Sequence, residues 1–222
     1  MGLAAVLVDM DGLLVDSEPL WTLAEEELAR ELGGVWSTEL KAAVMGTRLD
    51  VAVPAILEWY GREPTPDAVA YASGFLLDRM VELYGTSVPV RPGAVDLLEA
   101  LHVAGIPTAL VSSSFRVLVD AVLRTLGAAR FATSVAGDEV RHGKPNPEPY
   151  LTACQRLGVA PGQCVVLEDS EAGLRSGEAA GCAVIGVPDT AALVPAPGRT
   201  LVGSLVEVDL ALLEGLVSPA VT

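Results

Sequence analysis

Apolar residues along the first part of the chain change from a strand-like to a helical pattern. Residues 3–8 are all apolar and run directly into Asp9, a length that suits one buried β-strand but neither a membrane span nor a secretion signal. Between residues 17 and 86 the apolar positions recur at helical spacing, and no strand-like segment interrupts them. The pattern predicts helices at residues 17–32, 38–45, 48–60 and 66–84.

From residue 87 onward, short apolar segments alternate with helical patterns, which is typical of parallel βαβ units. The pattern predicts strands at 106–111, 132–135, 164–167 and 183–187, helices at 93–104, 115–126, 147–157, 171–180 and 207–216, and a loop at 188–198. The expected fold class is therefore α/β, a doubly wound, Rossmann-like parallel sheet with an inserted all-helical domain. We expect residues 1–16 and 87–222 to form the core and residues 17–86 to form a helical cap over the carboxyl edge of the sheet.

The charge of the chain limits its partners. With 29 acidic and 14 basic residues among 222, the formal net charge is −15, which disfavours binding to nucleic acid or anionic membranes. The three cysteines lack CxxC spacing, which favours buried free thiols and a cytoplasmic location over disulfides or a zinc site. We expect a monomer or weak dimer whose partner is a small molecule.

Two carboxylates follow the first predicted strand. Asp9 and Asp11 are two residues apart, and Gly12 gives the turn conformational freedom. Carboxylates gathered at a strand end repel one another unless a cation is present, and Mg²⁺ prefers such oxygen ligands. These residues alone leave a solvated acidic loop as an alternative.

Three further groups of polar residues lie at strand ends or before a helix. Residues 112–114 are serines that can cradle a phosphate, although helix capping explains them as well. Glu168 and Asp169 follow another strand, a position that suits either metal ligands or part of a capping box. Lys144 precedes a helix, where it is either a fixed cation of the site or a solvated surface side chain. Their convergence on one sheet edge indicates activation of a phosphoryl group.

These segments resemble the motifs of the haloacid dehalogenase superfamily, in the subfamily with a helical cap after the first motif. Residues 8–18 resemble the first motif, 111–112 the second, Lys144 the third and 167–170 the fourth, in the family's order and spacing. The resemblance implies a Mg²⁺-dependent phosphatase that hydrolyses small phosphate monoesters, sugar phosphates in particular, through an aspartyl-phosphate. Asp11 argues against a dehalogenase, since family dehalogenases lack an acid at this position.

The resemblance also implies roles for individual residues. Asp9 would be the nucleophile, and Asp11 would protonate the leaving alkoxide and then activate water. Ser112 would hold a phosphoryl oxygen through its hydroxyl, Ser113 would do so through its backbone N–H, and Lys144 would pair with Asp9 and the phosphoryl group.

A metal site follows from the same resemblance. Asp9, the backbone carbonyl of Asp11 and Asp169 would bind Mg²⁺, and Glu168 would join them directly or through water.

Two residues of the helical insert are expected to contact the substrate. Arg48 begins a predicted helix and would reach a distal hydroxyl or phosphate, unless it is a solvated helix-terminal residue. Trp21 would stack on a sugar ring, or else pack inside the insert.

Trp21 also bears on the choice between a phosphatase and a mutase. β-Phosphoglucomutases share the core and cap but carry a histidine at this position, and tryptophan cannot exchange a proton. The segments Ser-Glu-Pro-Leu-Trp and Met-Gly-Thr-Arg-Leu-Asp instead resemble those of 2-deoxyglucose-6-phosphate phosphatases. A sugar-phosphate phosphatase is therefore favoured. A phosphosugar mutase and a non-catalytic module that binds a phosphometabolite remain alternatives.

Overall fold

The chain forms two compact units. The computed structural model describes residues 2–44, 47–86, 88–189 and 192–217. Met45 and Gly46, which belong to the Met-Gly-Thr-Arg-Leu-Asp segment, lie outside the described residues. The core unit consists of Met1–Asp16 and Pro89–Thr222, and the helical unit consists of Ser17–Val88.

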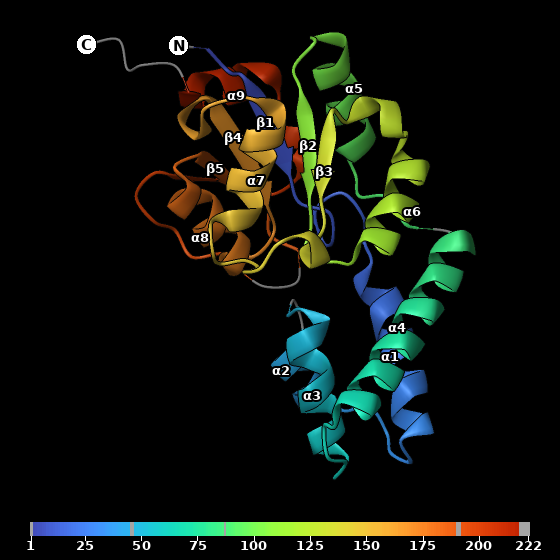
Figure 1. Ribbon diagram of the computed structural model, residues 1–222. Helices are drawn as coiled ribbons and strands as arrows, with labels where there is room; N and C mark the ends of the chain where they lie inside the picture. Colours follow the sequence, from blue (N-terminus) through green and yellow to red (C-terminus); the bar gives the residue numbers. More distant parts are fainter. Residues whose placement is uncertain (1, 45–46, 87, 190–191, 218–222) are drawn as a thin grey trace. The chain divides into compact units, whose positions relative to one another are not determined.

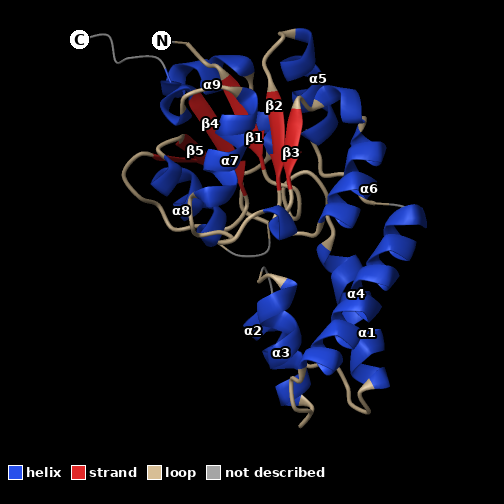
Figure 2. Ribbon diagram, viewed as in Figure 1, coloured by secondary structure: helices blue, strands red, loops and turns tan. Residues whose placement is uncertain are grey.

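A parallel sheet is the centre of the core unit (Figures 1 and 2). Its strands are β1 (Ala5–Val8), β2 (Thr108–Val111), β3 (Thr133–Val135), β4 (Cys164–Glu168), β5 (Ala183–Gly186) and β6 (Arg199–Leu201). They are ordered β3-β2-β1-β4-β5-β6, and every pair is parallel. The predicted α/β fold class is confirmed. Strand β6 was not predicted, because a partly exposed edge strand of three residues carries little apolar pattern.

Helices flank this sheet (Figure 2). The core unit contains α5 (Ala94–Val103), α6 (Arg116–Leu126), α7 (Glu148–Leu157), α8 (Glu171–Ala180) and α9 (Leu210–Val217), with short 3₁₀ turns η1 (Ala128–Arg130), η2 (Gly137–Glu139), η3 (Pro161–Gln163) and η4 (Leu205–Glu207). The single helix predicted at 207–216 is therefore replaced by the last residue of η4 and, from Leu210 onward, by α9. The described part of residues 188–198 is a loop, as predicted.

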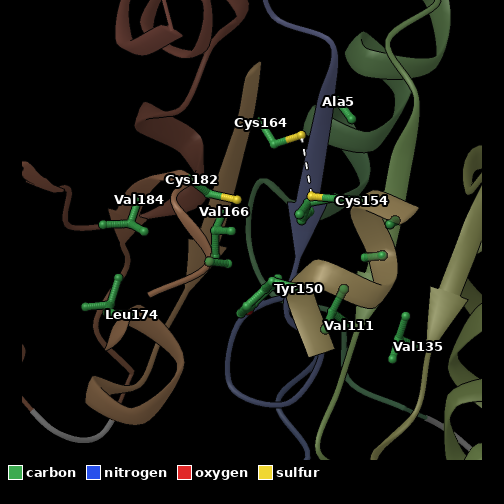
Figure 3. Close-up of a cluster of buried hydrophobic side chains, with 14 of the residues drawn as sticks. Ala5, Val111, Val135, Tyr150, Cys154, Cys164, Val166, Leu174, Cys182 and Val184 are labelled. Atoms are coloured by element: carbon green, nitrogen blue, oxygen red, sulfur yellow. Dashed lines mark hydrogen bonds between the residues drawn. The ribbon is translucent and has the colours of Figure 1, made fainter. Parts of the chain in front are cut away.

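One layer of the core lies between the sheet and helices α7 and α8. Alternate strand residues such as Ala5, Val111 and Val166 belong to this cluster, together with Tyr150 from α7 and Leu174 from α8 (Figure 3). Side chains alternate between the two faces of a strand, so these residues share one face.

The predicted thiols lie in the same cluster. Cys154, Cys164 and Cys182 are buried and form no disulfide, and the Sγ atoms of Cys154 and Cys164 are 3.9 Å apart (Figure 3). Their packing confirms the interpretation as small apolar side chains.

The strand register brings three loops together at the carboxyl edge of the sheet. Val8 of β1 pairs with Leu110 of β2 and with Leu167 of β4. The residues that end or follow these three strands are therefore neighbours in space. Strands β2 and β3 are added on one side of β1, and β4, β5 and β6 on the other. Open α/β sheets bind their ligands at the carboxyl ends of the strands where the order reverses in this way.

The helical unit contains α1 (Glu18–Glu31), α2 (Thr38–Val44), α3 (Leu49–Trp59) and α4 (Pro66–Thr86). Helix α4 packs on α1 and α3, and α2 packs on α3. Buried residues from three of these helices, Leu28, Ile56 and Leu76 among them, form its interior. Ser17 occupies the predicted N-cap position of α1, but its side chain makes no capping hydrogen bond. Among the described residues, no helix is both long and apolar enough to cross a membrane.

Candidate active site

A tight turn after β1 presents Asp9 at the sheet edge. The Asp9 N–H donates to the Leu167 carbonyl (3.0 Å), which extends the pairing of β1 and β4 by one residue. The turn closes where the Gly12 N–H donates to the Val15 carbonyl (2.9 Å). Gly12 has φ +83°, and a Cβ there would lie 2.1 Å from Oδ2 of Asp169. A glycine is therefore required for the first acidic loop to approach the second.

Lys144 is the buried cation of the site. Its ammonium group donates to Oδ1 of Asp9, to Oε1 of Glu168 (2.6 Å) and to the Val111 carbonyl (3.0 Å). Burial lowers the pKa of Lys144, but Asp9 and Glu168 outweigh that effect and raise it. The side chain is therefore a permanent positive charge beside Asp9.

Asp9 is buried, with only 6% of the residue exposed. Burial raises the pKa of Asp9; Lys144 opposes the shift, and Glu168 and Asp11 add to it. One ammonium group thus faces several carboxylates, so the site has an excess of negative charge. A cation would relieve this repulsion.

Asp11 is oriented by the serines that follow β2. Its Oδ2 accepts hydrogen bonds from the hydroxyls of Ser112 (3.1 Å) and Ser114 (2.8 Å), and the Ser114 N–H donates to the Ser112 hydroxyl (2.9 Å). Ser113 lies between them, and a Cβ at Gly137 would be 2.0 Å from its carbonyl oxygen. The serine loop and the loop after β3 are therefore in close contact.

Glu168 is completely buried and accepts hydrogen bonds at both oxygens. Oε1 accepts from Lys144 and from the Tyr150 hydroxyl (2.6 Å), and Oε2 accepts from the N–H (3.3 Å) and hydroxyl (2.9 Å) of Ser170. Four donors occupy the acceptor positions that a carboxylate has. This arrangement suits a residue that orients Lys144 better than a direct ligand of a metal ion.

An acidic cluster at the sheet edge can hold a divalent cation. Asp9, Glu168 and Asp169 each offer one oxygen, and these oxygens lie within 4.8 Å of one another. Burial raises the pKa of Asp169, and so do the negative charges of Asp9, Glu168 and Asp189. Carboxylate oxygens are the ligands that hard divalent cations prefer, so the donor set fits such an ion. With Glu168 already hydrogen-bonded, Asp9 and Asp169 are the carboxylates best placed to bind it.

The structure brings together the predicted site residues of the core unit, Asp9, Asp11, Ser112, Ser113, Lys144, Glu168 and Asp169. The other two belong to the helical unit. Arg48 is the N-cap residue of α3 and pairs with Asp50 (Nε–Oδ1, 3.1 Å). Trp21 is a half-buried residue of α1. Their proposed contacts with substrate stay predictions.

Sequence reasoning missed several contributors to the site. Ser114 was noted only as part of a serine run, and Tyr150 fell within the helix predicted at 147–157 without any role of its own. Ser170 was counted in the fourth motif without a role, and Asp189 was assigned to a loop. The serine run was a usable signal for Ser114. The remaining contacts depend on residues that are distant in the chain.

Comparisons with known proteins agree with this geometry. A family model described as haloacid dehalogenase-like hydrolase matches residues 3–181. Hexitol phosphatase A of Escherichia coli (strain K12) is 36% identical over 181 residues, which is 82% of this chain and 81% of that protein. The phosphorylated carbohydrates phosphatase of Thermotoga maritima is 31% identical over 178 residues, 80% of this chain and 81% of the relative.

A solved structure is similar throughout the chain. The crystal structure of CbbY from Rhodobacter sphaeroides in complex with phosphate superposes with a TM-score of 0.85 at 30% identity, covering 95% of this chain and 99% of that one. The chain belongs to the haloacid dehalogenase-like hydrolase family. Within this family it is a phosphatase, as its relatives are.

Proposed function

We propose that this phosphatase is Mg²⁺-dependent and hydrolyses small phosphate monoesters, sugar or sugar-alcohol phosphates in particular, with Asp9 as its nucleophile. The observation that carries the proposal is the environment of Asp9. It is buried at the carboxyl edge of the sheet, one oxygen accepts from Lys144, and it shares the acidic cluster with Asp169. A carboxylate in this setting is oriented for attack on an electrophile that carries negative charge.

The first chemical step would transfer the phosphoryl group to Asp9. An oxygen of Asp9 forms a bond to phosphorus while the bond from phosphorus to the sugar oxygen breaks, and the carboxylic acid of Asp11 protonates the leaving alkoxide. Lys144 holds the nucleophile and offsets phosphoryl charge. The Ser112 hydroxyl and the Ser113 N–H would bind phosphoryl oxygens, and Ser114 would keep Asp11 in place.

The second step would release inorganic phosphate. The Asp11 carboxylate takes a proton from a water molecule, the water oxygen attacks phosphorus, and the bond to Asp9 breaks. Asp9 is regenerated as a carboxylate and Asp11 as an acid. Mg²⁺, held by Asp9, the Asp11 carbonyl and Asp169, would supply compensation of phosphoryl charge.

We assign the substrate preference of the enzyme to the helical unit. The names of the relatives, a hexitol phosphatase and a phosphatase of phosphorylated carbohydrates, support a polyhydroxylated leaving group. Arg48 and Trp21 carry the chemistry that would recognise one, because a guanidinium binds hydroxyls or phosphate and an indole stacks on a sugar ring.

The central experiment measures phosphate release from a panel of sugar and hexitol phosphates, with Mg²⁺ and with EDTA. Asp9→Asn should lower kcat by about three orders of magnitude or more, since the amide is not nucleophilic. Asp78→Asn, an exposed position on α4, is the matched control and should retain full activity. Undiminished turnover by Asp9→Asn would rule out the nucleophile, and full activity in EDTA would rule out the metal.

A product analysis separates the phosphatase from the mutase alternative. With β-glucose 1-phosphate and a bisphosphate primer, we expect free phosphate and glucose, because Trp21 occupies the position where the mutases carry histidine. Accumulation of glucose 6-phosphate without phosphate release would identify a mutase instead.

A further inference from the structure

A fourth carboxylate, Asp189, borders the acidic cluster. It lies in the loop after β5, the strand next to β4, so it reaches the same edge of the sheet as Asp169. A Cβ at Gly12 would lie 2.1 Å from Oδ2 of Asp169 and 3.3 Å from Oδ2 of Asp189. Both oxygens therefore face one point beside the backbone of the first acidic loop.

An arginine anchors this carboxylate. Arg91 pairs with Asp189 through Nη1 and Oδ1 at 2.5 Å, and the two side chains are 26% and 13% exposed. The Arg91 N–H donates to the Leu14 carbonyl (2.9 Å), so the arginine is attached to the same turn that contains Gly12. The pair thus joins the loop after β5 to the loop that presents Asp9.

Among the described residues, the second oxygen of Asp189 accepts no hydrogen bond. Within the described part of the chain, Arg91 is its hydrogen-bonding partner and contacts Oδ1. Glu168, by contrast, accepts four hydrogen bonds. Asp189 therefore keeps one acceptor, Oδ2, on the side that it shares with Oδ2 of Asp169 beside Gly12.

We propose that Asp189, held by Arg91, is a positioning residue for the metal ion, and that its Oδ2 accepts a hydrogen bond from a water molecule bound to that ion. The inference rests on the proposed function. Mg²⁺ keeps several of its water ligands when it binds to proteins, and those waters need acceptors. Loss of such an outer partner typically weakens metal affinity by about 10- to 100-fold.

The test is isothermal titration of Mg²⁺ into EDTA-treated protein. Asp189→Ala should raise the Kd for Mg²⁺ about 10-fold, and the Mg²⁺ concentration for half-maximal rate should rise in proportion. Arg91→Gln should raise the Kd by a smaller factor, because Asp189 stays but is less well oriented. Glu99→Gln is the control, since it removes an ion pair with Arg130 (2.9 Å) elsewhere on the core unit.

The outcomes separate this inference from the function on which it rests. If wild type binds no Mg²⁺, the proposed function fails and the inference with it. If wild type binds Mg²⁺ and Asp189→Ala binds it equally well, the function stands and the inference is overturned. A lower Tm with unchanged Kd would show that the pair is only a tether between loops. Asp189→Asn, which keeps the size of the side chain, provides the same comparison if the alanine variant does not fold.

Discussion

Glu168 shows how one buried side chain orients several others. Its carboxylate receives Lys144 and Tyr150 on one oxygen and Ser170 on the other. The Lys144 ammonium also lies 5.1 Å from the centre of the Tyr150 ring, within the range of a cation–π contact. Asp9, the proposed nucleophile, accepts a hydrogen bond from Lys144, so its orientation depends in turn on the residues that position Lys144.

Tyr150→Phe tests this dependence. The change keeps the ring but removes one donor from a buried charged acceptor, which costs about 1.5–3 kcal/mol. We expect a lower free energy of unfolding in urea and a reduced kcat, with little change in KM. Tyr71→Phe is the matched control, because its hydroxyl donates to Glu31 on an exposed surface. Equal unfolding midpoints for the two variants would contradict a structural role for the Tyr150 hydroxyl.

At the scale of single elements, helix boundaries were predicted well and the smallest elements were not. Helices α7 and α8 begin and end within a residue or so of the predicted ranges, since capping residues and apolar spacing are local signals. Strand β6 and the short 3₁₀ turns η1 to η4 depend on neighbours supplied by the folded chain. Element type is therefore readable from sequence where an element is long enough to show a period.

Replacing either of two helical glycines with alanine should change the stability of the protein in opposite directions. Gly173 lies in α8, where a Cβ would be 1.8 Å from Cδ of Glu168, whereas a Cβ at Gly74 in α4 would meet nothing within 4 Å. Gly173→Ala should therefore displace Glu168, destabilise the fold by roughly 1–3 kcal/mol and reduce activity. Gly74→Ala should stabilise the helical unit by about 0.5–1 kcal/mol, because alanine is the better helix former. Thermal and urea unfolding measure both changes, and a stabilising Gly173→Ala would refute the packing argument.

At the scale of the whole molecule, the excess of acidic groups makes stability depend on pH. The formal net charge is −15, so repulsion between carboxylates opposes folding once they are ionised. Glu25 in α1 is the clearest single contributor outside the acidic cluster. Burial raises its pKa to about 8, with a further contribution from Glu18 and an opposing one from Lys41.

The raised pKa of Glu25 predicts that the protein loses stability as the pH rises. An unfolded glutamate loses its proton near pH 4.5, whereas folded Glu25 keeps it until about pH 8, so its contribution to stability is lost as the pH rises through that interval. Glu25→Gln resembles the protonated form and should raise the Tm at pH 8.5 by roughly 3 °C or more, with little effect at pH 5. Glu26→Gln, at the exposed neighbouring position, is the control. A Glu25→Gln protein with the same pH profile of Tm as wild type would contradict this account.

Most of the candidate site in the core unit was predictable because each motif is short and lies at a strand end or just before a helix. Asp9, Lys144 and Asp169 were selected from local sequence, and the parallel register of β1 and β4 brings the loops that carry two of them together. Their positions did not reveal that Glu168 is fully hydrogen-bonded. That depends on Tyr150, a residue of α7 that lies 18 positions away in the chain.

The sequence by itself determined the α/β class, the helical insert, the family and the strand-end residues, because periodicity and motif spacing are properties of neighbouring residues. The tertiary structure alone decided which of the carboxylates are already hydrogen-bonded and which face the acidic cluster. Glu168 accepts hydrogen bonds from three segments of the chain. Asp189 pairs through one oxygen with Arg91, which lies 98 positions away, and its other oxygen lies on the side of Asp169 beside Gly12. The physical reason is that the hydrogen-bonding state of a buried carboxylate depends on donors that only the folded chain brings to it.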